Sequence, residues 1–238
     1  MKRAIIVGAS SGIGRELAKI LSSNQYVVGI MARRVQLLDE LGKEVEGTLF
    51  VQRIDVADVE SAMDALAMLI KKMDGVDLVV ISAGTGDINN SLDWYLENET
   101  IKTNVNGFSA VANVAMRHFT EKGSGHLVGI SSIAALRGGR ESPAYNASKA
   151  FESNYLEGLR QKVRKSGLPI TITDIKPGFV NTAMAKGDGI FWAAEPEEAA
   201  RQIYQVIKQK KSSAYITRRW VLIAWLIKLL PGLIYERL

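Results

Sequence analysis

The 238-residue chain contains no cysteine, which excludes disulfides and thiolate metal sites. This absence is compatible with a reducing compartment, and we expect a cytoplasmic protein. No secretory signal is predicted, because the apolar strand pattern Ala4–Val7 begins almost at once. The longest apolar run, Trp220–Ile227, is shorter than the roughly 20 residues that a helix needs to cross a bilayer.

The sequence also lacks any dense block of one charge. Its net charge is +5, and 23% of its residues are charged, which is ordinary for a globular protein. The mild basicity is compatible with an anionic ligand, an acidic surface nearby, or neither. The short run Lys208–Lys211 is best explained as the solvated end of a helix, where the helix dipole favours cations. We therefore expect no nucleic-acid partner, and no metal site is predicted.

Linkers, internal repeats and low-complexity stretches are missing as well, and the length suits a single domain. Short runs rich in Val, Ile and Leu alternate with longer helical patterns. This order predicts an α/β fold with a doubly wound, seven-stranded, mainly parallel sheet and helices on both faces. The expected strands are Ala4–Val7, Tyr26–Met31, Thr48–Arg53, Leu78–Ser82, His126–Ser131, Ile170–Ile175 and Ala214–Thr217. The expected helices lie near 13–23, 35–44, 58–73, 93–121, 144–166 and 196–210.

A glycine-rich turn follows the first expected strand and leads into a helix. Glycine permits a tight turn and lets the backbone approach a pyrophosphate, while the helix N-terminus attracts its negative charge. Such a turn also suits any strand-to-helix connection, but its position after the first strand favours dinucleotide binding. The residues of this expected phosphate site are Gly8, Ser10, Ser11, Gly12, Ile13 and Gly14.

The second expected strand ends in Met31-Ala32-Arg33-Arg34, without the acidic residue that would bind the ribose hydroxyls of NAD. Guanidinium groups can hold a phosphate through paired, charge-assisted hydrogen bonds. Two solvated arginines are the alternative, although the dipole disfavours cations at a helix start. Arg33 and Arg34 therefore predict NADP(H) as the cofactor.

Tyr145 and Lys149 stand four residues apart at the start of an expected helix and so share one helix face. An ammonium group beside a phenol favours the phenolate, which suits tyrosine to general acid–base chemistry. A surface Tyr and Lys with this spacing is the plain alternative. Ser132 follows the preceding strand, where it can bond a substrate oxygen.

Together, these motifs resemble the short-chain dehydrogenase/reductase family in its compact single-domain branch, over roughly residues 1–217. The shared pattern comprises the Gly8/Gly12/Gly14 turn, Asn104 in Asn-Val-Asn-Gly, Ser132, the Tyr145/Lys149 pair and Pro177-Gly178. The resemblance implies a Rossmann-type catalytic domain over 1–217. It also implies an oxidoreductase that transfers a hydride between NADP(H) and a carbonyl or alcohol carbon.

The resemblance also implies residue roles. Tyr145 is the acid/base, Lys149 assists it and bonds the nicotinamide ribose, Ser132 polarises the substrate oxygen, and Asn104 holds a relay water. The cofactor-binding positions implied beyond the glycine turn and the arginines are Asp55, Val56, Ala83, Gly84, Tyr145, Lys149, Pro177, Gly178, Val180 and Thr182.

Two positions depart from the family pattern. Val7 stands where the family usually has threonine, and Ser82 begins a Ser-Ala-Gly where Asn-Ala-Gly is usual. Both family residues mainly brace the fold, so the departures affect local hydrogen bonds more than the expected chemistry.

The segment near 183–195 resembles a substrate loop, and its Met, Phe and Trp favour a substrate with an apolar portion. Ordinary loop packing is the alternative for each aromatic residue. The apolar extension 218–238 has three open interpretations: it covers the pocket, joins a partner subunit, or lies in a membrane interface. Membrane contact is the minority interpretation, because a helix that is apolar all round is more often buried in protein.

The resemblance further implies a homodimer or homotetramer that pairs through the helices near 93–121 and 144–166. Two other functions compete with an enzyme of this type. A non-catalytic NADP-binding redox sensor would not need all of Asn104, Ser132, Tyr145 and Lys149. A nucleotide-sugar epimerase or dehydratase shares the Tyr/Lys spacing but usually carries a longer C-terminal substrate domain.

Overall fold

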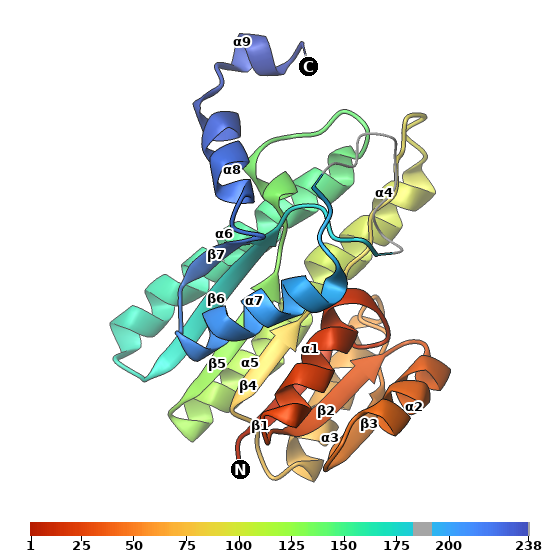
Figure 1. The fold of residues 1–238 in the computed structure, drawn as a ribbon, viewed down its shortest axis with the longest axis vertical. Helices are drawn as coiled ribbons and strands as arrows, with labels where there is room; N and C mark the ends of the chain where they lie inside the picture. The colour runs from red at the N-terminus through yellow and green to blue at the C-terminus, as the bar shows by residue number, and fades with distance from the viewer. Residues whose placement is uncertain (183–191, 238) are drawn as a thin grey trace.

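The computed structural model describes residues 1–182 and 192–237 (Figure 1). Within these residues, seven strands form one sheet in the order β3-β2-β1-β4-β5-β6-β7, and every neighbouring pair is parallel. The strands are β1 (Arg3–Val7), β2 (Val27–Ala32), β3 (Leu49–Arg53), β4 (Leu78–Ile81), β5 (Gly125–Ile130), β6 (Ile170–Pro177) and β7 (Ser213–Ile216). The chain reverses its direction across the sheet between β1 and β4, which confirms the predicted doubly wound α/β fold.

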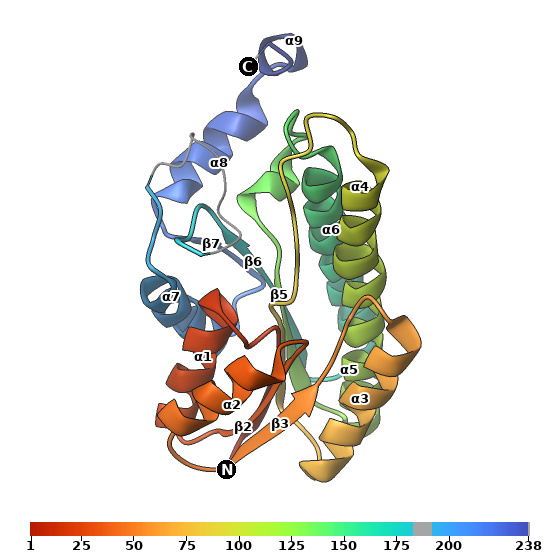
Figure 2. The ribbon, with the colours of Figure 1, turned by 90° about the vertical axis from the view of Figure 1, so that its right-hand side faces the viewer.

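Helices cover both faces of the sheet, as Figure 2 shows with α1, α2 and α7 on one side and α3, α5 and α6 on the other. Their bounds are α1 (Gly12–Ser23), α2 (Val35–Glu44), α3 (Val59–Lys72), α5 (Phe108–Lys122), α6 (Pro143–Ser166) and α7 (Pro196–Lys208). Apart from the start of α5, every one of these bounds lies within two residues of the expected one, because apolar periodicity and the flanking Gly and Pro residues mark these boundaries.

Two apolar cores lie on opposite faces of the sheet, and alternate residues of β1 belong to different cores. In β1, Ile5 and Val7 pack with α3 and α5, whereas Ala4 and Ile6 pack with α1 and α7. All four side chains are fully buried. Burial on both faces explains why the strands appear in the sequence as unbroken apolar runs.

The helix expected over 93–121 is not a uniform α-helix. It consists of α4 (Trp94–Ile101), a π-helical segment η1 (Lys102–Gly107) and α5. A π turn inserts an extra residue into the helix and often marks a functional position. Gly107, the last residue of this segment, packs closely against the backbone of Val56. A Cβ on Gly107 would lie 2.3 Å from the Val56 carbonyl oxygen. Periodicity did not reveal the π segment, because its six residues Lys102–Gly107 include one large apolar side chain, Val105, and so carry no apolar pattern of their own.

Three short helical segments complete the described structure. A 3-10 turn η2 (Ile133–Leu136) follows β5, and helices α8 (Trp220–Leu229) and α9 (Gly232–Tyr235) follow β7. Figures 1 and 2 show α8 and α9 extending beyond the end of the sheet, away from the N-terminus. Among the described residues, no helix is both long and apolar enough to cross a membrane.

Candidate active site

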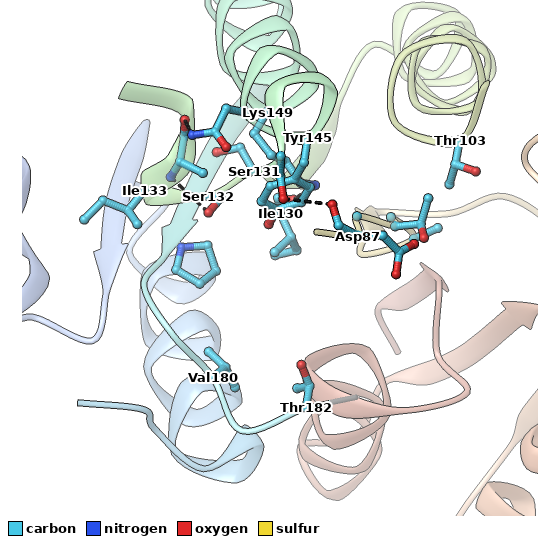
Figure 3. A pocket seen from close by; sticks show the side chains of 18 of the residues that line it. Asp87, Thr103, Ile130, Ser131, Ser132, Ile133, Tyr145, Lys149, Val180 and Thr182 are labelled. Carbon is cyan, nitrogen blue, oxygen red and sulfur yellow. Dashed lines mark hydrogen bonds between the residues drawn. The ribbon is translucent and has the colours of Figure 1, made fainter. Parts of the chain in front are cut away.

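A cavity of about 1360 Å³ lies beyond the carboxyl ends of the strands, which is where open α/β sheets bind ligands. The segments directly after β1 to β6 line most of it, and Figure 3 shows part of this lining. The predicted site residues on its wall are Gly8, Ser10, Ser11, Gly12, Ile13, Arg33, Arg34, Asp55, Val56, Ala83, Gly84, Ser132, Tyr145, Lys149, Pro177, Gly178, Val180 and Thr182. Gly14 and Asn104 are buried behind this wall.

The glycine turn is shaped by close backbone contacts. Gly8 has a positive φ of +96°, and a Cβ on it would lie 2.4 Å from the backbone nitrogen of Ala83. A Cβ on Gly14 would lie 2.2 Å from the carbonyl oxygen of Gly8. Only glycine fits these two positions. The turn places the N-terminus of α1 at the cavity, and the free N–H groups of this helix end favour an anion there.

Arg34 connects the end of β2 to this turn. Its Nη2 atom donates hydrogen bonds to the hydroxyl oxygens of Ser10 and Ser11, both at 2.9 Å. Arg33 lies beside it, exposed and also on the cavity wall. The two guanidinium groups thus place positive charge next to the glycine turn, on the side that follows β2.

Ser132, Tyr145 and Lys149 lie together on the wall that faces Val180 and Thr182 (Figure 3). Ser132 follows β5, and its hydroxyl accepts a hydrogen bond of 3.1 Å from the N–H of Ala134. Tyr145 and Lys149 occupy the first turns of α6, and the Lys149 ammonium lies 5.9 Å from the centroid of the Tyr145 ring. The structure therefore brings the three predicted side chains to one side of the cavity.

The ring of Tyr145 packs on the loop that follows β4. A Cβ on Gly86 would lie 2.3 Å from Cδ2 of Tyr145, so any larger residue would push the ring away. Gly86 was not among the predicted site residues. The Gly-Thr-Gly sequence after β4 was its signal, since a glycine near the end of a strand often marks a close approach of another group.

The ammonium group of Lys149 is buried and donates three hydrogen bonds to two groups. Its Nζ atom donates to the Ile130 carbonyl oxygen at 3.1 Å and lies 2.9 Å from both carboxylate oxygens of Glu152. Burial by itself lowers the pKa of Lys149, but the charge and hydrogen bonds of Glu152, together with Tyr145 and Asp174, outweigh it and raise this pKa above its ordinary value. Lys149 is therefore held in its charged form.

Glu152 is fully buried, and this burial raises the pKa of its carboxyl to about 7. Sequence analysis missed Glu152. Its signal was the i, i+3 spacing from Lys149 on a helix, which places opposite charges side by side.

A second buried charge, Asp174 on β6, lies behind Ser132. Asp174 accepts hydrogen bonds from the hydroxyls of Ser131 at 2.5 Å and Ser153 at 2.7 Å, and it pairs with Lys176. These contacts join β5, β6 and α6. They fix the strand end that carries Ser132 relative to the helix that carries Tyr145.

Asn104 lies in the π-helical segment, with its side chain directed at the loop after β4. It donates to the Thr85 carbonyl oxygen at 2.7 Å, accepts from the Thr85 N–H at 2.8 Å, and donates to the Ser148 hydroxyl at 2.9 Å. A Cβ built on Gly84 would meet both Asn104 Oδ1 at 3.3 Å and Lys149 Nζ at 3.2 Å. Asn104 and Lys149 thus flank the same point on this loop.

The opposite wall is formed by the segment after β6. A Cβ on Gly12 would lie 2.9 Å from Cγ2 of Thr182, so this segment crosses over the glycine turn. The predicted substrate loop near 183–195 lies largely outside the described residues, because 183–191 are not described. The tail contributes Gly232, Tyr235 and Glu236 to the cavity wall, in agreement with the interpretation that it covers the pocket.

A sequence model described as short chain dehydrogenase matches residues 2–190 of this chain. The protein belongs to the short-chain dehydrogenase family. As a short-chain dehydrogenase it is an oxidoreductase by family, which confirms the resemblance drawn from the motifs. An uncharacterized oxidoreductase of Myxococcus xanthus is 36% identical to it over 188 residues, covering 77% of this chain and 74% of that protein.

Solved structures share the fold of this short-chain dehydrogenase. A short-chain dehydrogenase from Streptomyces avermitilis superposes with a TM-score of 0.83 at 22% identity, covering 99% of this chain and 93% of that one. An actinorhodin polyketide ketoreductase with NADPH gives a TM-score of 0.78 at 23% identity, covering 90% and 95%. At these identities the likeness concerns the fold.

Proposed function

We propose that this short-chain dehydrogenase transfers a hydride between NADP(H) and a carbonyl or alcohol carbon, with Tyr145 as general acid/base. One observation carries the proposal: a single cavity is lined both by the glycine turn with its two arginines and by Ser132, Tyr145 and Lys149. A phosphate-binding end and a proton-transfer end in one cavity suit a dinucleotide that spans both.

The residues present fit this cofactor. Gly8 and Gly14 keep the turn free of side chains, α1 directs its N-terminus into the cavity, and Arg33 and Arg34 would hold a 2′-phosphate. Asp55 and Val56 would flank the adenine. Bound NADPH would supply the hydride. The likeness to a ketoreductase with NADPH supports this choice over NADH.

At the other end of the cavity, Ser132 would donate its hydroxyl proton to a hydrogen bond with the substrate oxygen, because its oxygen already accepts from Ala134. Tyr145 would give its phenolic proton to that oxygen during reduction and take it back during alcohol oxidation. Lys149, kept charged by Glu152, would stabilise the phenolate and bond the nicotinamide ribose. Asn104 would hold a water beside Lys149, at the point that both side chains flank.

The remaining wall favours a substrate with an apolar portion. Ile88, Ile133 and Phe179 line the cavity near the proposed proton-transfer residues. Ligand sites commonly combine such apolar walls with a few polar groups that fix orientation.

The deciding experiment measures NADPH oxidation against a panel of aldehydes and ketones, with the wild type and Tyr145→Phe. We expect the variant to lose turnover by a factor of roughly 10² or more while it still binds NADPH. Tyr95→Phe is the matched control, since Tyr95 is an exposed tyrosine on α4. Retained turnover in Tyr145→Phe would remove Tyr145 from its role. NADPH binding without oxidation by any carbonyl compound would favour the sensor.

A further inference from the structure

Large apolar side chains are exposed on the two C-terminal helices. The residues that we name the tail surface each have more than half of their surface exposed: Leu222, Trp225, Leu226, Leu229, Leu233 and Ile234. Figures 1 and 2 show the helices that carry them standing clear of the sheet and its covering helices. A concentration of exposed apolar groups of this kind marks an interaction site.

Helix α8 is apolar around its whole circumference. Lys228 is the one charged residue among its ten, and Trp220 and Ala224 are the ones that are buried. A helix that is apolar all round is normally covered on every side. Because the described residues of the domain leave the rest of this helix uncovered, we expect a partner to cover it.

Specific contacts hold the tail in place. The ring of Trp220 packs on Gly178, where a Cβ would lie 2.1 Å from the indole, and meets the Phe179 ring edge-on at 5.5 Å. Arg137, on the cavity wall, donates to the Leu230 carbonyl oxygen at 2.5 Å and stacks on Tyr235 at 4.8 Å from the ring centroid. Tyr235 in turn donates its hydroxyl proton to the Gly138 carbonyl oxygen at 2.6 Å. The tail surface is thus presented in a fixed orientation at the rim of the cavity.

The charged residues of the tail indicate which kind of partner its surface binds. Residues 218–238 contain four cations, Arg218, Arg219, Lys228 and Arg237, against one acid, Glu236. Cations beside exposed Leu, Ile and Trp side chains match a surface of anionic headgroups over acyl chains. A second copy of the chain is a poorer match, because a symmetric pair would bring two such cationic segments together.

We propose that α8 and α9 dock on an anionic lipid bilayer, with the tail surface among the headgroups and upper acyl chains. The ten residues of α8 span about 15 Å, which suits a helix that lies in the interface. Because Gly232, Tyr235 and Glu236 line the cavity, docking would set the cavity mouth at the lipid surface, within reach of apolar molecules dissolved there. The proposal stands independently of the reaction that the cavity catalyses.

The test is cosedimentation of the purified full-length protein with two kinds of vesicle. One kind is phosphatidylcholine alone, and the other contains a third of phosphatidylglycerol. The variant Leu222→Gln/Leu229→Gln removes two exposed leucines of α8, and Met68→Gln/Leu92→Gln removes two exposed apolar side chains elsewhere. A charge variant, Arg218→Gln/Lys228→Gln, is matched by Lys43→Gln/Lys165→Gln. Circular dichroism melting confirms that each variant is folded.

We expect the wild type to bind the anionic vesicles more tightly than the neutral ones. The leucine variant should lose roughly tenfold or more in partitioning, and the charge variant about tenfold, while both controls match the wild type. The proposal is overturned if the wild type stays in the supernatant with anionic vesicles, or if the leucine variant binds like its control. A wild-type dimer in ultracentrifugation that the leucine variant dissociates, without vesicle binding by either protein, would identify a second copy as the partner and would equally overturn it.

Discussion

The carboxylate of Glu152 lies directly against the ammonium group of Lys149. Both of its oxygens are 2.9 Å from Nζ, and both side chains are buried. Lys149 and Glu152 are three residues apart on α6, so the helix itself sets their separation. Glu152 is the main group that raises the pKa of Lys149, and Tyr145 and Asp174 add to its effect.

Glu152→Gln should make activity decline at a lower pH on the alkaline side of the pH profile. The amide keeps the shape of the side chain but removes the main charge that raises the pKa of Lys149. The buried ammonium then keeps the Ile130 carbonyl and the weaker effects of Tyr145 and Asp174. We expect the alkaline limb of the kcat profile for alcohol oxidation to move down by about one unit or more. Glu157→Gln, at an exposed position of the same helix, is the control. Superimposable profiles for wild type and Glu152→Gln would show that Glu152 is only a packing residue.

Arg33→Glu should discriminate between the two nicotinamide cofactors. The change places a carboxylate where we expect the 2′-phosphate, so NADPH affinity should fall by roughly 10- to 100-fold, as for the loss of a charge-assisted hydrogen bond. NADH affinity should stay the same or improve. Fluorescence titration with both cofactors measures the ratio, with Arg164→Glu on the exposed end of α6 as the control. An equal loss for both cofactors would contradict phosphate recognition by Arg33.

Gly14→Ala should damage the glycine turn itself. The added methyl group would lie 2.2 Å from the Gly8 carbonyl oxygen, so the turn or α1 must shift. We expect a loss of about 1–3 kcal/mol in the free energy of unfolding, together with weaker cofactor binding. Gly42→Ala is a matched control, because its methyl group meets ordinary van der Waals contact inside α2 and should stabilise the helix by about 0.5–1 kcal/mol. Equal stability of the two variants in urea unfolding would refute the close contact.

His126 should make the protein less stable in acid. It is buried on β5, and its Nε2 atom lies 2.7 Å from the hydroxyl of Thr173, which itself donates to the Lys211 carbonyl oxygen. Burial lowers the pKa of His126 to about 4, with Lys210 and Lys2 adding to the effect. Between pH 6.5 and about 4, His126 is therefore protonated in the unfolded chain but neutral in the folded protein. The free energy of unfolding falls as the pH drops through this range.

The size of this effect can be measured with His126→Gln. From pH 7.5 to pH 5 the wild type should lose about 2 kcal/mol more than the variant. The difference between the two proteins is the relevant quantity, because the raised pKa of Glu152 makes its own contribution fall with rising pH over about 4.5 to 7. His118→Gln, which removes the other histidine, keeps His126 and should keep the acid loss. Parallel pH dependences for the wild type and His126→Gln would contradict the assignment.

The sequence by itself determined the order and most boundaries of the strands and helices of this short-chain dehydrogenase. Runs of Val, Ile and Leu mark the strands, and Gly or Pro marks the ends of the helices. These local signals agree with the tertiary packing of this protein. Local spacing also identified Gly8, Gly12 and Gly14 and the Tyr145/Lys149 pair, because a turn and a helix face each depend on residues near in sequence.

Only the tertiary structure decided which groups meet across the fold. Gly86 contacts the Tyr145 ring, 59 residues away, and Asn104 bonds Thr85, 19 residues away. The burial of Glu152 likewise depends on the packing around it, which spacing along the chain does not report. The same holds for the tail, whose apolar sequence suits burial in protein as well as a lipid surface. The tertiary structure decides its exposure: Trp220 and Tyr235 anchor the tail at the cavity rim, and the described residues around it leave its other apolar side chains uncovered.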